Sequence, residues 1–158
     1  MGKILYTLIG LVVLTLVGAQ LGLLKGRQPS LGLRDGKLKP PSATPNSVSS
    51  QADLHSDHPQ RDYARIDPLR YTGDSNAAMK KLATVLRGMD RMTIVTEQPD
   101  YVYAQQQTAL MKYTDDVEFA LDAQARVIHV RSSSRLGRKD YGVNRARVEA
   151  VRKRFASN

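Results

Sequence analysis

Cysteine and tryptophan are both missing from this 158-residue chain, and the absence of cysteine narrows the chemistry available to it. Without cysteine there is no disulfide, no thiolate zinc site, no cysteine-held iron–sulfur cluster and no cysteine nucleophile. The compartment stays open, because an exported protein can also lack cysteine. The length allows one modest domain, and an apolar content of 41% is typical of a globular chain rather than a disordered one.

Charged residues are missing from one long stretch near the N-terminus, residues 4–24. As a helix this stretch spans about 30 Å, the thickness of a bilayer core, and it lacks the polar stripe of a core helix. The alternative is a cleaved signal peptide with Val17-Gly18-Ala19 as its cleavage site. Because the apolar run continues beyond Ala19, we interpret residues 1–24 as a retained transmembrane anchor.

The next segment, residues 25–62, is rich in proline, glycine and serine and has neither a helical nor a strand period. We interpret it as a largely extended tether that begins to pack near Asn46. It contains His55 and His58. Two histidines in such a tether are typical of solvated side chains, so we expect no metal site there.

The remaining residues, 63–158, carry the periodic patterns of a folded domain. Apolar residues at helical spacing predict a helix that is capped by Asp74 or Ser75, and a second helix over 143–155. Strand patterns occur near Leu69 and over residues 92–97, 101–113, 116–122 and 127–133. Consecutive strands with separate helices indicate an α+β domain. We expect a mostly antiparallel sheet of four to five strands with two helices packed on it, preceded by one transmembrane helix.

The last two predicted strands are expected to pair as an antiparallel hairpin. Burying Phe119 beside Ile128 places Glu118 opposite Arg131 or His129 on the other face of the sheet. Such an opposite-charge pair contributes about 0.2–1 kcal/mol when it is exposed. We expect it either on the solvent side of the sheet or in a ligand site.

Charge is distributed unevenly along the chain, whose net charge is +9. Residues 41–125 carry 8 basic and 12 acidic side chains, whereas residues 126–158 carry 10 basic and 2 acidic ones. The basic third surrounds one loop and the start of the last predicted helix, where N–H groups, hydroxyls and arginines suit a phosphate or carboxylate. The candidate anion-binding residues are Arg131, Ser132, Ser134, Arg135, Asn144 and Arg145.

The same segment also predicts an internal role, because acidic partners lie near these arginines in the sequence. In that interpretation a structural network locks the loop to the helix. Its members are Asp115, Asp116, Glu118, Gly137, Asp140, Gly142 and Glu149. We expect no nucleic-acid partner, because no binding motif and no aromatic stacking platform adjoins the basic patch. The anchor makes anionic lipid headgroups the nearer candidate.

Catalysis is the alternative function. Asp115, Asp116 and Glu118 bring carboxylates close together, and His129 lies across the hairpin, a combination found in hydrolases and magnesium sites. No nucleophile elbow, phosphate-binding loop or metal-binding histidine pair accompanies them. We assign no catalytic residue, metal ligand or cofactor, and keep a small hydrolase or divalent-metal enzyme as the alternative.

Four motifs carry a resemblance to a known family: P-N-S-V-S-S-Q at 45–51, D-D-V-E-F at 115–119, V-I-H-V-R-S-S-S-R-x-G at 127–137 and D-x-G-x-N-R-x-R-V-E at 140–149. Together they resemble the domain-of-unknown-function family 1499 over about residues 45–155. The resemblance implies a small envelope-associated domain without an established activity. Members are mostly bacterial and often carry an N-terminal signal or anchor. Many look like P-N-C-V-S-S, where this chain has Ser47.

Two observations disagree about the side of the membrane on which the domain lies. Basic residues are denser after the apolar run than before it, which by the positive-inside rule favours the cytoplasm. The resemblance implies export. We expect a single-pass inner-membrane protein with a periplasmic domain. It would act as a binding or structural module toward membrane lipid, an anionic small molecule or an envelope protein.

Overall fold

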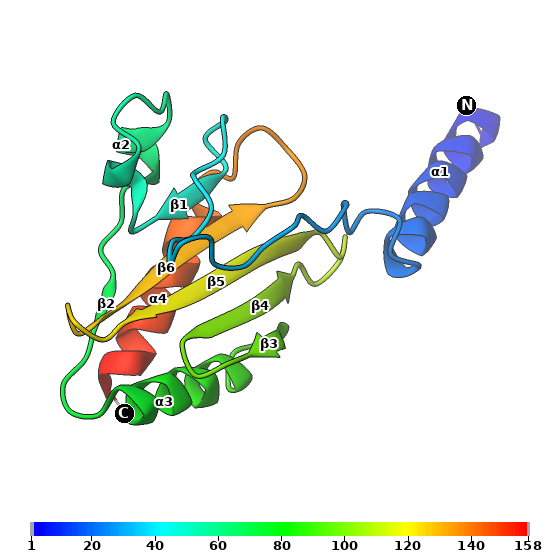
Figure 1. Ribbon diagram of the computed structural model, residues 1–158. Coiled ribbons are helices and arrows are strands. Elements are labelled where there is room, and N and C mark those ends of the chain that lie inside the picture. Colours follow the sequence, from blue (N-terminus) through cyan, green and yellow to red (C-terminus); the bar gives the residue numbers. More distant parts are fainter. Residues whose placement is uncertain (1, 158) are drawn as a thin grey trace.

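The computed structural model describes residues 2–157, and its helices and strands form an α+β domain preceded by one apolar helix (Figure 1). The elements are α1 Gly2–Gln20, β1 Ser47–Ser49, the 3₁₀ helix η1 Ala52–Leu54, α2 Arg61–Ala64, β2 Leu69–Arg70, α3 Ser75–Arg87, β3 Met92–Glu97, β4 Tyr101–Gln107, β5 Thr114–Asp122, β6 Val127–Ser134 and α4 Val143–Ser157. The strands form one antiparallel sheet in the order β1-β6-β5-β4-β3, with β2 also paired to β6. The predicted fold class is confirmed, with six strands instead of four to five.

Helices α3 and α4 pack on one face of the sheet and enclose the main core (Figure 1). Helix α3 begins after Asp74, whose carboxylate accepts a hydrogen bond of 2.8 Å from the Ala77 backbone N–H. This is one of the two caps that the sequence predicted, and it satisfies a backbone donor left free by the first helical turn. The core is filled by Leu86 of α3, Val151 of α4 and Phe119 of β5.

Strand β4 is shorter than predicted, because residues 108–113 form a loop to β5 instead of continuing the strand to Tyr113. The Thr108 N–H donates to the Tyr113 carbonyl over 3.0 Å, and Lys112 adopts a φ of 54°. A residue in the left-handed region interrupts the extended backbone. The alternating side chains of this segment gave no sign of that interruption.

The face of the sheet opposite the two helices is covered by the chain itself. Residues 28–42, which we call the strap, run across β5 and β6 between α1 and β1 (Figure 1). Leu38 of the strap is buried against Tyr101 and Tyr103 of β4. The strap lies inside the range interpreted as a tether, and the exact segment boundaries there stay a prediction.

The strap changes the environment of β5, whose polar face was expected on the solvent side of the sheet or in a ligand site. Glu118 pairs with Arg131 across the hairpin, as predicted. The solvent-side position considered for this pair is wrong, because the Glu118 side chain is 0% exposed beneath the strap. A pair that is deeply buried obeys different energetics from an exposed one.

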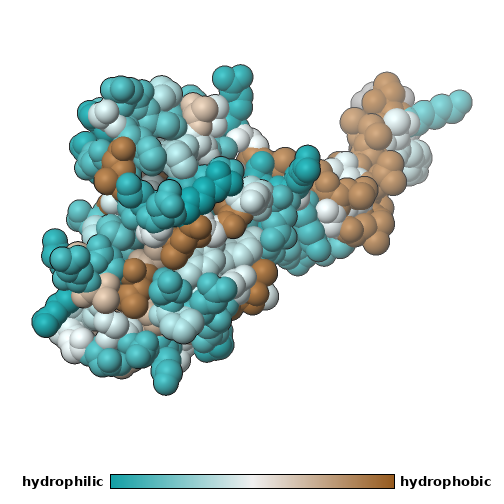
Figure 2. Space-filling view, in the orientation of Figure 1, coloured by the Kyte–Doolittle hydropathy of each residue, from teal (hydrophilic) through white to brown (hydrophobic). Residues whose placement is uncertain are grey.

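Helix α1 is, among the described residues, the one helix long and apolar enough to cross a membrane (Figure 2). Its 19 residues span about 28 Å. It ends four residues before the apolar run does, in a turn closed by Gly22, whose φ is 82°. The Gly22 N–H donates to the Ala19 carbonyl and the Leu23 N–H to the Gly18 carbonyl, the pattern of a Schellman motif.

Candidate functional site

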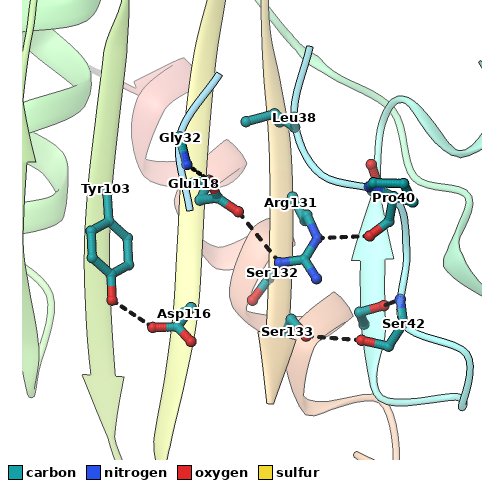
Figure 3. Close-up of polar contacts among 12 residues, drawn as sticks. Gly32, Leu38, Pro40, Ser42, Tyr103, Asp116, Glu118, Arg131, Ser132 and Ser133 are labelled. Atoms are coloured by element: carbon teal, nitrogen blue, oxygen red, sulfur yellow. Dashed lines mark hydrogen bonds and ion pairs between the residues drawn. The ribbon is translucent and has the colours of Figure 1, made fainter. Parts of the chain in front are cut away.

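A row of charged side chains lies between the strap and the middle of the sheet (Figure 3). Asp116 and Glu118 are two residues apart on β5 and therefore project from the same face. Arg131 of β6 lies directly opposite Glu118, and Tyr103 of β4 lies opposite it on the other side. The row therefore follows from strand register alone.

Glu118 is the centre of the first cluster. Its Oε2 atom lies 3.3 Å from Nη1 of Arg131, whose side chain is also buried. Its Oε1 atom accepts hydrogen bonds from the Tyr101 hydroxyl at 2.8 Å and from the Gly32 N–H at 3.1 Å. Arg131 in turn donates through Nε to the Pro40 carbonyl at 3.2 Å. The strap backbone thus completes the hydrogen bonding of both members of a buried ion pair.

Asp116 forms the second cluster with Arg135, which directly follows β6. Nη2 of Arg135 lies 2.7 Å from Oδ1, and Nε lies 2.9 Å from Oδ2, so the contact is bidentate. The Tyr103 hydroxyl donates to Oδ1 at 2.6 Å (Figure 3). Both side chains of the ion pair are at most 6% exposed. Planar two-point contacts of this kind fix geometry as well as charge.

Burial and these carboxylates change how the neighbouring groups titrate. Burial, together with the hydrogen bond to Asp116, raises the pKa of Tyr103 to about 12. Burial and the charge of Glu118 also raise the pKa of Tyr101. Burial lowers the pKa of the Arg131 guanidinium, although Glu118 opposes that effect. Both hydroxyls therefore remain protonated donors at neutral pH.

A third cluster lies on the helix side of the sheet, at the start of α4. Asn144 accepts a 2.7 Å hydrogen bond from the Ser132 hydroxyl and donates to the Asn46 carbonyl at 2.9 Å. Arg147 donates to the Ser132 hydroxyl at 2.9 Å and forms an ion pair with Asp115. These contacts connect α4 to β5, to β6 and to the residue before β1.

The loop between β6 and α4 is held by Asp140. Its carboxylate accepts hydrogen bonds from the N–H groups of Asn144 at 2.9 Å and Gly142 at 3.2 Å, and from the Tyr63 hydroxyl. Although burial opposes the effect, these bonds hold the pKa of Asp140 below its ordinary value. Arg145 donates to the Tyr63 carbonyl at 2.6 Å.

The six candidate anion-binding residues all make hydrogen bonds to protein groups. Arg131 binds Glu118, and Arg135 binds Asp116. Ser132 and Ser134 both bind the Asn144 side chain. Arg145 donates to the Tyr63 carbonyl. This is the pattern expected of the internal network that the sequence offered as the alternative. A ligand role for these six residues stays a prediction.

The residues predicted for the structural network are not all joined to one another. Gly137 accepts from the Asn46 side chain at 2.7 Å, and both Gly137 and Gly142 have positive φ. Glu149 lies apart and pairs with Arg152 at 3.0 Å on the surface of α4. The three carboxylates of the hydrolase alternative project from two faces of the sheet, Asp115 toward α4 and the other two toward the strap. Among residues 2–157 no group of three or more His, Asp or Glu side chains is placed to hold a metal ion.

The sequence did not identify Tyr101, Tyr103 and Arg147 as hydrogen-bonding partners in these clusters. Tyr101 and Tyr103 lie in the strand predicted over residues 101–113, but nothing in the sequence indicated which carboxylates they would meet. Arg147 follows Asn144 by three residues and so shares its helix face, and that spacing was a usable signal.

The end of the sheet nearest α1 forms a separate surface. The Gln20 side chain at the end of α1 donates to the Leu110 carbonyl at 2.9 Å. A Cβ atom on Gly26 would lie 2.8 Å from Cβ of Arg135, so the chain leaving α1 lies closely against the β6–α4 loop. We call residues 108–113 and 135–142 the anchor-side loops.

The anchor-side loops combine exposed apolar and basic side chains. Leu110 is 61% exposed and Leu136 is 44% exposed. Arg138 and Lys139 are exposed beside Leu136. In Figure 2 the hydrophobic colour of α1 continues toward the body of the domain at this junction.

Comparison with known proteins gives one family. The family model described as "Protein of unknown function (DUF1499)" matches residues 37–155. The match begins in the strap and ends in α4, so it contains the whole sheet and excludes α1. No curated protein and no solved structure matches the chain.

Proposed function

The chain belongs to the DUF1499 family of proteins of unknown function, and from this premise we propose that it is a membrane-tethered module whose anchor-side loops bind anionic lipid headgroups. One observation carries the proposal. The end of the apolar helix contacts one loop through Gln20 and Leu110, and the segment that leaves the helix contacts the other through Gly26, which lies against Arg135 and Leu136. If α1 lies in a bilayer, these contacts bring the loops to the surface of that bilayer.

The chemistry of the loops supports a lipid partner. Leu110 and Leu136 offer apolar side chains of the kind that enter the boundary between headgroups and acyl chains. Arg138 and Lys139 offer positive charge, and each basic residue near an anionic bilayer contributes about 1 kcal/mol. The anchor raises the local lipid concentration, so weak individual contacts are sufficient for binding.

Fluorescence tests the lipid contact directly, because the chain has no tryptophan of its own. In the full chain in nanodiscs, the emission of a Leu136→Trp variant should be shifted to the blue with anionic lipid relative to neutral lipid. Raising the salt concentration to about 1 M should reduce the shift, because the screening length falls to about 3 Å.

Charge reversal gives the matched control for that experiment. Adding Arg138→Glu and Lys139→Glu to the Leu136→Trp chain should abolish the blue shift. Adding Arg126→Glu and Lys153→Glu changes the net charge equally but alters exposed residues away from the anchor-side loops, and should leave the shift in place. An equal loss with both pairs would contradict a lipid-binding role of the loops.

We also propose that the protein lies in the inner membrane with its domain in the periplasm. The export habit implied by the family resemblance supports this, against the basic residues that follow α1. A C-terminal alkaline phosphatase fusion should be active, and a matched cytoplasmic reporter fusion should be inactive. The reverse result would place the domain in the cytoplasm. The loops would then bind lipid of the cytoplasmic leaflet.

A further inference from the structure

A serine, a histidine and an aspartate come together where β1 ends. Ser50 directly follows β1, and its Oγ atom lies 3.1 Å from Nδ1 of His129 on β6. The other ring nitrogen, Nε2, lies 3.9 Å from Oδ2 of Asp122 at the end of β5. Asp122 is itself positioned by a 2.8 Å hydrogen bond from the Ala125 N–H. Hydroxyl, imidazole and carboxylate in this order are the parts of an activated serine nucleophile.

The backbone fixes the direction of the Ser50 hydroxyl. The Val130 N–H donates to Oγ at 2.9 Å, and the Ser50 N–H donates to the Val130 carbonyl at 2.9 Å. Since Oγ accepts from Val130, its own proton is free to point at Nδ1 of His129. The ring proton then sits on Nε2, toward Asp122. The Val130 N–H also stabilises the negative charge that develops when Oγ loses its proton.

The three side chains open onto one cavity. Ser50, His129 and Asp122 line a cavity of about 580 Å³ together with Leu54 and Leu121. This volume lies within the range of small-molecule sites. Burial lowers the pKa of His129, although Asp122 opposes the effect. The imidazole is therefore neutral at neutral pH, as a general base must be.

We propose that Ser50 and His129 are the nucleophile and general base of a site that cleaves small carboxylic esters, with Asp122 as a positioning residue. The site is separate from the anchor-side loops. A negative result for ester cleavage therefore does not affect the lipid proposal. It also differs from the Asp115, Asp116 and Glu118 alternative, because none of those carboxylates takes part.

The reaction balances with water as the second reactant. Oγ of Ser50 attacks the carbonyl carbon while Nδ1 of His129 takes the hydroxyl proton. The bond between the acyl carbon and the alcohol oxygen then breaks, and the proton passes from His129 to the leaving alkoxide. Water adds to the acyl-serine, His129 accepts a proton from it, and the same proton returns to Oγ as the carboxylic acid leaves.

A fluorophosphonate probe tests the nucleophile on the full chain in detergent micelles. Mass spectrometry should find one adduct, on Ser50 and not on the exposed Ser56. His129→Gln should slow the labelling by about 100-fold or more, the range of general-base assistance. Asp122→Asn should slow it less, because Asp122 acts through the histidine. An unlabelled Ser50, or labelling at the same rate without His129, would overturn the proposal.

A cysteine at position 50 gives a second test of the nucleophile, and it is preferred to Ser50→Ala because alanine would lose the hydrogen bond from the Val130 N–H. The chain has no cysteine, so Ser50→Cys introduces a unique thiol. Its alkylation by iodoacetamide at neutral pH should be at least about tenfold faster than that of Ser56→Cys, because a neighbouring imidazole promotes the thiolate. The advantage should vanish when His129→Gln is added. Equal rates for the two thiols would refute a reactive, accessible Ser50.

Discussion

At the scale of single residues, Glu118 shows most clearly how burial makes one side chain important for stability. Its side chain is 0% exposed and lies beside the guanidinium of Arg131. The Tyr101 hydroxyl and the Gly32 N–H complete its hydrogen bonding. Taking two charges out of water is costly, and their attraction compensates only when both partners are present. The pair therefore holds β5 and β6 in a register that a change at either residue disturbs.

Removing Arg131 tests this dependence. Arg131→Met should lower the free energy of unfolding by about 3–5 kcal/mol, because Glu118 is left as an uncompensated buried charge. Adding Glu118→Leu should recover part of that loss, because no buried charge then remains, while the Tyr101 hydroxyl and the Gly32 N–H lose their acceptor. Urea unfolding followed by circular dichroism measures both.

An exposed ion pair is the control for that measurement. Nη2 of Arg65 lies 2.6 Å from Oδ1 of Asp53, but the two side chains are 52% and 63% exposed. Arg65→Met should leave the midpoint of unfolding nearly unchanged, as expected of surface pairs. If the two arginine variants unfold at the same urea concentration, burial does not set the importance of the Glu118 pair.

The raised pKa of Tyr103 predicts that the free energy of unfolding decreases at alkaline pH. This pKa is about 12 in the fold, whereas that of an unfolded tyrosine is about 10. Between these values the unfolded chain has lost a proton that the folded chain retains, so the free energy of unfolding falls as pH rises. Below about pH 10 the contribution is complete.

Tyr103→Phe removes this titration and should flatten the decline of stability above about pH 10. Urea unfolding of both chains at a series of alkaline pH values gives the two slopes. Absorbance near 295 nm follows tyrosinate formation in parallel. Identical slopes for the two proteins would contradict the retention of the Tyr103 proton in the fold.

The partners of single residues were predictable only where the hairpin fixed them. The alternation of Phe119 and its neighbours was enough to place Glu118 opposite Arg131. Arg135 was not assigned to Asp116, because Arg135 lies just beyond β6 and its direction depends on the loop. Burial was misjudged for the whole row, since an amphipathic strand pattern carries no information about what covers its polar face.

Secondary-structure elements with a regular period were predicted well. The apolar faces of α3 and α4 and the alternation of β5 and β6 gave these elements to within a few residues. The strap has no such period, because its polar contacts with Glu118 and Arg131 are made by its backbone, through the Gly32 N–H and the Pro40 carbonyl. A proline-rich segment that binds through its backbone has the same sequence signature as a solvated tether.

The start of α3 gives a prediction at the scale of one element. Asp74→Ala should lower the free energy of unfolding by about 1 kcal/mol, because the Ala77 N–H loses its acceptor. Asp74→Asn is the matched control, since asparagine caps helices about as well as aspartate. Thermal unfolding by circular dichroism compares them, and equal losses from both changes would show that charge rather than capping matters there.

The whole molecule combines a compact family domain with an apolar helix outside the family match. The helix and the segment that follows it lie against the two anchor-side loops, while the β5–β6 turn lies at the other end of the sheet (Figure 1). This polarity was not predictable from the sequence. It depends on contacts between residues about 90 positions apart, such as Gln20 with Leu110.

The most direct measurement of this polarity uses spin labels on single cysteines, which the native chain permits because it has none. Labels at Leu110→Cys, Leu136→Cys and Gln124→Cys are placed in the full chain in anionic nanodiscs. We predict that the first two collide more with oxygen dissolved in lipid than with a water-soluble nickel complex, and that the label at position 124, in the β5–β6 turn, does the opposite. Equal exposure of all three labels to the nickel complex would contradict a domain held with its anchor-side loops on the membrane.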